Sequence, residues 1–303
     1  MTAPAALSDR WLAREDNAAL LLDGAARHSY DPDRDIDWDA PPVPGLLYAP
    51  ERQLSLYGTP LWDGLTREQQ VELSKHEVAS IACTGVWFEM ILMQMLLRHA
   101  YDRDLATAHV RWTLTEIADE CRHSSMFGRM VQVTGCPSYG PGPGVRLLGK
   151  VCKTVSDSAL TFGGTLYVEE LLDGLQRAAV KDESVQPLAR AVSKVHVVEE
   201  SRHIRFAREE IRSRAATLTR RQRSVARLEL ALVAYFATRA LVAPQVYASV
   251  GLDVPTAVRT AKANPHWRDA KRDAAKRVIP LLEECGLIGG PSRWLWRKAD
   301  LVD

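Results

Sequence analysis

Two copies of one short string carry the residues most able to do chemistry. Each string is an acidic pair followed by a spacer, an arginine and a histidine, and the copies cover residues 119–123 and 199–203. In the first, Glu120 precedes His123 by three residues, and in the second Glu200 precedes His203 by three. Residues three apart on an α-helix lie about 60° apart around its axis, so one carboxylate and one imidazole can bind the same metal ion. The two strings therefore predict two halves of a dinuclear metal site.

The second string has a further potential ligand upstream. His196 precedes Glu200 by four residues and His203 by seven, so all three side chains share a narrow stripe of one predicted helix. Asp119 and Glu199 come directly before the ligand glutamates. We expect them to accept hydrogen bonds from the imidazoles of the opposing string, which would fix the orientation of each ring. An ordinary helix salt bridge with a nearby arginine is the alternative for both.

Two other predicted helices offer one glutamate each. Glu89 is the only charged residue in the apolar segment 86–93, and a carboxylate there must be paired, protonated or bound to metal because an isolated buried charge is very costly. Glu77, in a more polar stretch, is its competitor. On the other helix Glu169 is favoured over its neighbour Glu170. Carboxylate and imidazole ligands suit iron or manganese, whereas zinc uses fewer ligands and often thiolates, so we predict two iron ions offset by four glutamates.

Apolar residues at helical spacing predict the elements that must position these side chains. Thr66 is a predicted N-cap with Gln69 in the capping-box position. The expected helices cover residues 66–101, 105–133, 147–180, 187–212, 219–243 and 265–286. No stretch alternates as a strand would, so the predicted fold class is all-α, a ferritin-like four-helix bundle. We expect a single domain over 1–303, with an irregular N-terminal arm (1–63) that has one short helix near its start, a metal-binding core (65–213) and further C-terminal helices (218–303).

Composition excludes several classes of function. The 303 residues include 39 basic and 38 acidic ones, so no overall field would attract nucleic acid or an anionic membrane, and we expect a small-molecule substrate. The five cysteines show no Cys-x-x-Cys spacing, which argues against a disulfide framework and favours the reducing cytoplasm. The first 16 residues lack the apolar run of a secretory signal. The most apolar stretch, 228–244, is interrupted by charges and is interpreted as a buried core helix.

The order of the candidate ligands resembles that of the arylamine N-oxygenases typified by p-aminobenzoate N-oxygenase, a branch of the ferritin-like di-iron oxygenases. The matching residues are Glu89, Glu120, His123, Glu169, His196, Glu200 and His203. The resemblance covers most of the chain from about residue 65. It implies that these seven ligands hold two iron ions, that O2 is activated through a peroxo-di-iron species, and that an aromatic amine is N-oxygenated in a biosynthetic pathway. No flavin or nicotinamide fingerprint is present, so an external electron donor is expected. A homodimer is also expected.

Other functions stay open at this point. No arginine or donor cluster that could bind the carboxylate of an aminobenzoate is evident near Glu89 or Glu169. Another amine, or C–H hydroxylation on a tailoring pathway, is therefore an alternative. A ferritin-like metal storage or detoxification protein is the non-enzymatic alternative, although a minimal storage bundle would not need the long terminal segments.

Overall fold

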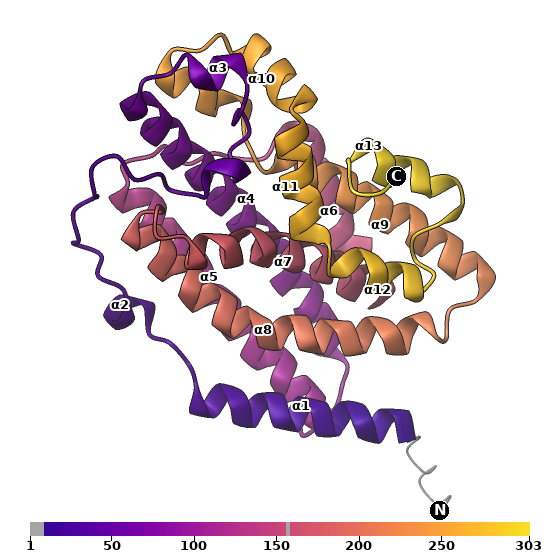
Figure 1. The fold of residues 1–303 in the computed structure, drawn as a ribbon. Helices are drawn as coiled ribbons and strands as arrows, with labels where there is room; N and C mark the ends of the chain where they lie inside the picture. The colour runs from indigo at the N-terminus through magenta and orange to yellow at the C-terminus, as the bar shows by residue number, and fades with distance from the viewer. Residues whose placement is uncertain (1–8, 156–157) are drawn as a thin grey trace, which may run out of the picture.

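The core of the protein is a bundle of four long helices. The computed structural model describes residues 9–155 and 158–303, and within them every regular element is a helix (Figure 1). The core helices are α4 (Arg67–Tyr101), α5 (Ala108–Val133), α7 (Ser158–Lys181) and α8 (Pro187–Ala215). In the bundle α4 packs against α5 and α7, and α8 packs against the same two helices. The predicted all-α, ferritin-like fold is confirmed.

The starts of the core helices follow from local sequence. The Thr66 hydroxyl accepts a hydrogen bond from the Gln69 N–H, and the Gln69 side chain accepts one from the Thr66 N–H, which is the predicted capping box of α4. The Thr107 hydroxyl caps α5 by accepting a hydrogen bond from the Val110 N–H. At the start of α8, Pro187 occupies the first turn, where its missing N–H costs nothing.

The single helix predicted over 147–180 is wrong, because this segment contains two helices. The first is α6 (Pro143–Val155), which packs on α4 and α9 (Arg220–Ala240), and the second is α7. The junction between them, residues 156–157, lies outside the described residues. Gly163, inside α7, allows close packing, since a Cβ atom there would lie 2.9 Å from Leu230 of α9. Both helices are amphipathic, so the apolar period continues across the junction and the sequence does not reveal the break.

The N-terminal arm is also more regular than predicted. It begins with α1 (Asp9–Arg27), a helix of 19 residues that packs across α5 and α8. Only the following segment is irregular, with the short helices α2 (Pro32–Asp35), η1 (Glu51–Gln53) and α3 (Pro60–Asp63). The sequence of α1 is polar, and few apolar side chains, among them Ala18 and Leu21, are buried against the bundle. A long-range contact secures it instead, because Arg14 binds Glu210 of α8 through two bonds of 2.5 Å.

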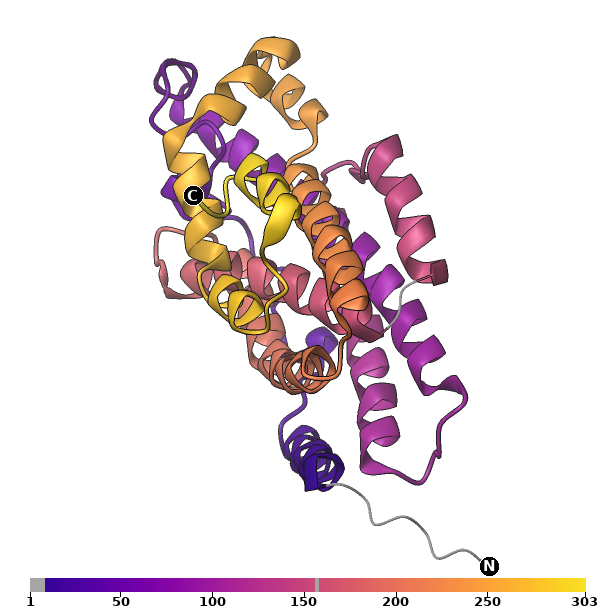
Figure 2. The ribbon, with the colours of Figure 1, turned by 90° about the vertical axis from the view of Figure 1, so that its right-hand side faces the viewer.

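A C-terminal layer covers one side of the bundle. After α9 come η2 (Pro244–Val250), α10 (Val254–Ala263), α11 (Pro265–Ala275), α12 (Val278–Glu284), η3 (Gly290–Ser292) and α13 (Arg293–Lys298). The helix predicted over 265–286 is thus two helices, α11 and α12. Figure 2 shows α9 between α6 and this layer. Gly174 of α7 lets α11 approach closely, since a Cβ atom there would lie 2.5 Å from the carbonyl oxygen of Ala274.

Helix α4 is the most apolar long helix of the chain. Among the described residues it alone is long and apolar enough to cross a membrane by length and composition, and half of its most apolar window is buried inside the protein. The prediction that 228–244 is the most apolar stretch is therefore wrong. Apolar residues of α4 such as Leu92 and Leu96 are buried, and the helix also buries the carboxyl groups of Glu77 and Glu89.

Candidate metal centre

The four core helices bring the candidate ligands together in the middle of the bundle. Glu120 and His123 come from α5, and Glu200 and His203 from α8. One ligand atom from each of these four residues lies within 4.8 Å of those from the other three, and all four side chains are at most 1% exposed. The two duplicated strings thus meet face to face, although they are 80 residues apart in the sequence.

The acidic residue before each ligand glutamate contacts the histidine of the opposing string. The Nε2 atom of His123 lies 2.9 Å from Glu199 Oε2, and the Nε2 atom of His203 lies 3.2 Å from Asp119 Oδ2. Both acids also face arginines, Arg122 at 2.5 Å from Asp119 and more distantly at 3.5 Å from Glu199. Each carboxylate therefore combines a contact to an imidazole with a salt bridge, the two roles weighed from the sequence.

These contacts determine which nitrogen of each ring faces inward. When Nε2 donates its proton to Glu199 or Asp119, the Nδ1 atom of a neutral imidazole carries a lone pair and no proton. For His203, Nδ1 lies 2.9 Å from Glu120 Oε1 and 3.2 Å from Glu200 Oε2. A lone pair that faces two carboxylates is repelled unless a proton or a metal ion lies between them. The geometry is thus that of metal ligands oriented by outer carboxylates.

His196 is oriented in the opposite sense. Its Nδ1 atom lies 2.6 Å from the side-chain oxygen of Gln176, so Nδ1 carries the proton. Its Nε2 lone pair then faces Glu200 Oε2 at 3.6 Å and Glu89 Oε1 at 3.9 Å. Gln176 was missed in the sequence, but it follows Glu169 by seven residues, two turns along the same face of α7, and that spacing could have identified it.

Several oxygen atoms of the cluster have no hydrogen-bond partner among the described residues. Both carboxylate oxygens of Glu169 are in this state, as is the Oε1 atom of Glu200. Glu89 is bound on one side only, by the Ser124 hydroxyl at 2.5 Å. Buried polar atoms are nearly always satisfied, and a group of unsatisfied carboxylate oxygens points to a cation. The residues present therefore fit a dinuclear site for iron or manganese.

The two competing glutamates are engaged elsewhere. Glu170 forms an ion pair with Arg208 of α8 on the other side of α7. Glu77 accepts hydrogen bonds from the N–H of Ser55 at 3.0 Å and from its hydroxyl at 2.6 Å. It also lies twelve residues, or about 18 Å along α4, from Glu89. Glu169 and Glu89 are the members of each pair that face the cluster.

Another buried glutamate beside the ligands was missed in the sequence. Glu116 precedes Glu120 by one turn of α5, is 1% exposed, and accepts a hydrogen bond of 3.0 Å from the indole N–H of Trp112. Burial, together with the charges of Glu120 and Glu200, raises its pKa to about 8. The spacing of four residues places Glu116 on the same face as Glu120, and that signal was available.

The electrostatics of the cluster also favour a cation. Burial and the neighbouring Glu120 charge raise the pKa of Glu89 to about 8, and burial with the Glu200 charge raises that of Glu169 well above its ordinary value. Burial alone would lower the pKa of His123, yet its contacts with Glu120 and Glu199 raise it to about 10. Glu89 and Glu169 thus favour their protonated forms, whereas the contacts of Glu120 with His123 and His203 lower its pKa. Divalent ions would replace the protons on the two glutamates and on the imidazole.

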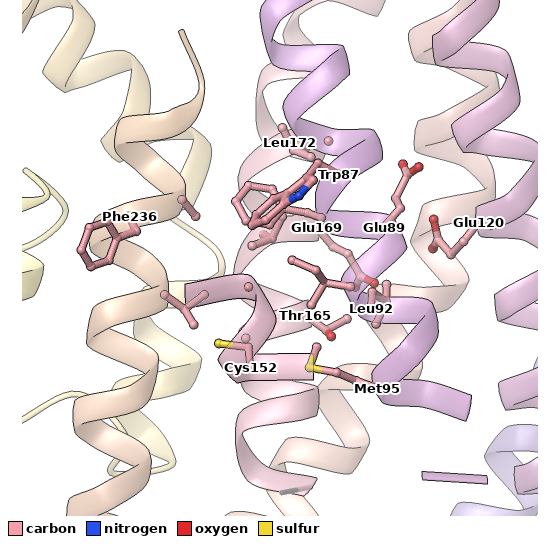
Figure 3. Close-up of a pocket in the computed structure, with 18 of the residues that line it drawn as sticks. Trp87, Glu89, Leu92, Met95, Glu120, Cys152, Thr165, Glu169, Leu172 and Phe236 are labelled. Carbon is pink, nitrogen blue, oxygen red and sulfur yellow. The ribbon is translucent and has the colours of Figure 1, made fainter. Parts of the chain in front are cut away.

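A cavity extends from one side of the ligands. Its volume, counted as the space open to the centres of water molecules, is about 70 Å³. Helices α4, α6, α7 and α9 form its walls (Figure 3). Glu89, Glu120 and Glu169 lie at one end of it, and apolar side chains such as Trp87 and Phe236 line the rest. A small apolar molecule in this cavity would therefore lie directly against the metal ligands.

A second histidine cluster has a different character. His99, His109 and Glu210 lie close together, and the Nε2 atom of His109 is 3.0 Å from Glu210 Oε1. Both oxygens of Glu210 are, however, bound by Arg14 of α1. Burial and the charge of Arg103 lower the pKa of His99 to about 3, so this ring is neutral. The bidentate arginine makes this cluster an anchor for α1, and His99 and His109 are core residues.

An all-α bundle with a buried cluster of glutamates and histidines between its four core helices defines a protein of the di-iron oxidase and oxygenase class. Residues 12–286 match the family described as p-aminobenzoate N-oxygenase AurF, and the chain belongs to this family. The family resemblance seen in the sequence is thereby confirmed, and it extends further toward the N-terminus than residue 65.

Two mycobacterial proteins are among the relatives. An uncharacterized protein of Mycobacterium bovis and one of Mycobacterium tuberculosis are each 29% identical to this chain over 288 residues, which is 92% of this chain and 85% of each relative. Among solved structures, a mutant R2-like ligand-binding oxidase with a reconstituted Mn/Fe cofactor matches over 96% of this chain and 92% of its own, at 13% identity and a TM-score of 0.43.

Proposed function

We propose that the protein is a di-iron monooxygenase that N-oxygenates an aryl amine with O2. The observation that carries the proposal is the convergence of three imidazole lone pairs and several unpartnered carboxylate oxygens at one end of an apolar cavity. Two iron ions would be held there by Glu89, Glu120, His123, Glu169, His196, Glu200 and His203. When bound, the iron would supply the electrons that reduce O2, and an external donor would restore them.

The protein's own residues orient the ligands and exclude water. Glu199 holds the ring of His123, and the N–H of Tyr30, in the arm, in turn donates a 2.9 Å hydrogen bond to Glu199. Gln176 holds His196 with its Nε2 atom toward the cluster. The apolar walls keep bulk water from the reacting centre, which strengthens electrostatic interactions and protects reactive species from side reactions. The arm therefore belongs to the functional unit.

The cavity also bears on the alternative functions. Iron storage requires many hydrated ferrous ions to pass through the site in succession, whereas an enzyme is loaded once, and an apolar cavity beside the ligands is a poor path for such ions. An organic substrate would be stabilised by the same walls. C–H hydroxylation uses the same centre and differs in the atom presented to it, so identification of the product separates it from N-oxygenation.

Iron loading and product analysis test the proposal. The protein is loaded anaerobically with ferrous iron, bound iron is counted, and ¹⁸O2 is admitted with a panel of aryl amines and an electron donor. We expect two iron ions per chain and one labelled oxygen atom on the amine nitrogen. Fewer than two ions, or consumption of no organic substrate, would contradict the proposal.

A pair of histidine variants sharpens the test. His196→Ala removes one ligand and is expected to keep the fold, because the ring packs beside Phe127 at the edge of the cluster, but to lose O2 chemistry. His76→Ala is the matched control on α4, where the ring contacts Glu72 and Tyr139 away from the site. Turnover by His196→Ala at the rate of the unchanged protein would refute the seven-ligand arrangement.

A further inference from the structure

The cavity beside the metal centre has no group that could balance a negative charge on a substrate. No lysine or arginine is found among the described residues that line it. Its carboxyl and imidazole groups all lie at the metal end, and they are Glu89, Glu120, Glu169, Glu200 and His196. The thiol of Cys152 also lines the cavity, and burial raises its pKa to about 11, so it is neutral. Four carboxylates offset two divalent ions and leave no surplus positive charge. A carboxylate on the substrate would thus be buried uncompensated, at a high cost in free energy.

One polar group lies on the wall away from the ligands. Thr165 of α7 is 5% exposed, and its hydroxyl has no hydrogen-bond partner among the described residues. Threonines within helices commonly bond the carbonyl of the preceding turn, as Thr113 does on α5 at 2.9 Å. The Thr165 hydroxyl makes no such bond and lines the cavity, in Figure 3 between Glu169 and the sulfur atoms of Cys152 and Met95.

The position of Thr165 sets a distance from the metal end. It precedes Glu169 by four residues, which is one turn and about 6 Å along α7. The remaining wall is apolar and includes Trp87, which packs against α6 so closely that a Cβ atom at Gly149 would lie 2.5 Å from its ring. A ring-sized molecule can therefore span from the ligands to the Thr165 hydroxyl.

We propose that the substrate is an uncharged aromatic amine without a carboxylate, and that Thr165 binds a neutral polar substituent at the end of the ring remote from the amine. This inference rests on the proposed function for the assignment of the reacting end. It separates the chain from an enzyme for p-aminobenzoate itself, whose carboxylate would lie where the wall is uncharged. The Thr165 hydroxyl can donate or accept, so an amide or a hydroxyl substituent satisfies it equally.

Calorimetry with three matched ligands tests the inference without turnover. The ligands are 4-aminobenzamide, which is neutral and polar, 4-aminobenzoate, which is anionic, and 4-methylaniline, which is apolar. Binding is measured on the protein loaded with zinc, which undergoes no redox change. We expect 4-aminobenzamide to bind at least about tenfold more tightly than 4-aminobenzoate, a difference of about 1.4 kcal/mol. Equal or tighter binding of 4-aminobenzoate would overturn the inference.

Two substitutions locate the effect. Thr165→Val is expected to weaken 4-aminobenzamide about tenfold and leave 4-methylaniline within twofold, because only the amide uses the hydroxyl. Thr115→Val, at a half-buried position of α5 that does not line the cavity, is the control and should change neither affinity. Val145→Lys places a cation on the α6 wall and should tighten 4-aminobenzoate selectively. An unchanged affinity for 4-aminobenzamide in Thr165→Val would exclude the assigned role of Thr165.

Failure of the inference and failure of the proposed function give different results. If 4-aminobenzamide binds with the expected preference but iron-loaded protein forms no oxygenated product from it, the proposed function fails and the assigned ligand class stands. If 4-aminobenzoate binds more tightly and is oxygenated, the proposed function stands and the inference fails.

Discussion

The structure predicts both the sign and the size of the change in unfolding free energy that a substitution of Glu77 causes. Its carboxyl group is 1% exposed, and its contacts are the N–H and hydroxyl of Ser55, with Tyr247 beyond at 2.9 Å from that hydroxyl. Burial raises its pKa from 4.5 to about 7, although the bonds from Ser55 oppose the increase. The folded protein therefore holds a proton on Glu77 over a pH range in which the unfolded chain has released it.

The pH dependence follows from linkage. Because the pKa of Glu77 is higher in the folded state, its full contribution to stability is present below about pH 4.5 and is lost as the pH rises to about 7. A pKa difference of one corresponds to about 1.4 kcal/mol, so the loss reaches about 3 kcal/mol above pH 7. Glu77→Gln resembles the protonated form, since its amide can accept from the Ser55 N–H and donate to the Ser55 hydroxyl. The variant should exceed the original protein in stability by an amount that grows from near zero at pH 4.5 to about 3 kcal/mol at pH 8.

Urea denaturation at several pH values between 5 and 8 measures this difference, and the subtraction removes groups common to both proteins. Glu68→Gln, at the exposed start of α4, is the control. Hydrogen bonds with its own backbone N–H and with Thr66 lower the pKa of Glu68, so its effect on stability should not vary over this range. A difference for Glu77→Gln that is constant with pH, or that grows toward acid, would show that Glu77 is ionised in the folded protein and would refute the reasoning.

Three further substitutions test the supports of the site and the fold. Glu199→Ala removes the partner of the His123 ring and should weaken iron binding about 10- to 100-fold in a chelator competition; unchanged affinity would show that the contact does not orient the ligand. Gly174→Ala should lower the free energy of unfolding by about 1–3 kcal/mol, because its Cβ atom meets the backbone of α11, whereas Gly128→Ala, with open space around it, should not destabilise. Arg14→Ala leaves the carboxylate of Glu210 buried without its ion pair and should cost about 3–5 kcal/mol in urea denaturation; a loss below about 1 kcal/mol would show that α1 is held by other contacts.

What could be predicted from the sequence is what depends on neighbours within one helix. The capping box of Thr66 and Gln69 involves residues three apart, and so do the pairs of glutamate and histidine. The preference for Glu169 over Glu170 has another basis, the gap from Glu169 to His196 in the family resemblance. The structure places Glu169 at the cavity and pairs Glu170 with an arginine.

What could not be predicted depends on contacts between distant segments. Nothing local distinguishes Arg14 from other arginines in a polar helix, since its partner Glu210 lies 196 residues away. The sequence does not show that α6 and α7 are separate helices, because both are amphipathic and the apolar period continues from one to the other. Gln176 and Glu116 lie at helical spacings from candidate ligands. The Glu-x-x-His pattern does not include them, because it defines only the pairs of ligands and not the other residues on the same helix faces.

The position of the cavity suggests a functional reason why only the second of the duplicated strings is preceded by a histidine, His196. His123 and His203 have equivalent surroundings, each ring facing an acid of the other string and turning Nδ1 inward. At the position on α5 that corresponds to His196 the chain has Glu116, so His196 has no counterpart among the histidines, and it turns Nε2 inward. The cavity is lined by His196 but by neither of the other two rings. The extra imidazole therefore lies on the side from which a substrate would approach, so the residue that distinguishes this ligand set from a symmetric pair is also the nitrogen donor nearest to the reacting molecule.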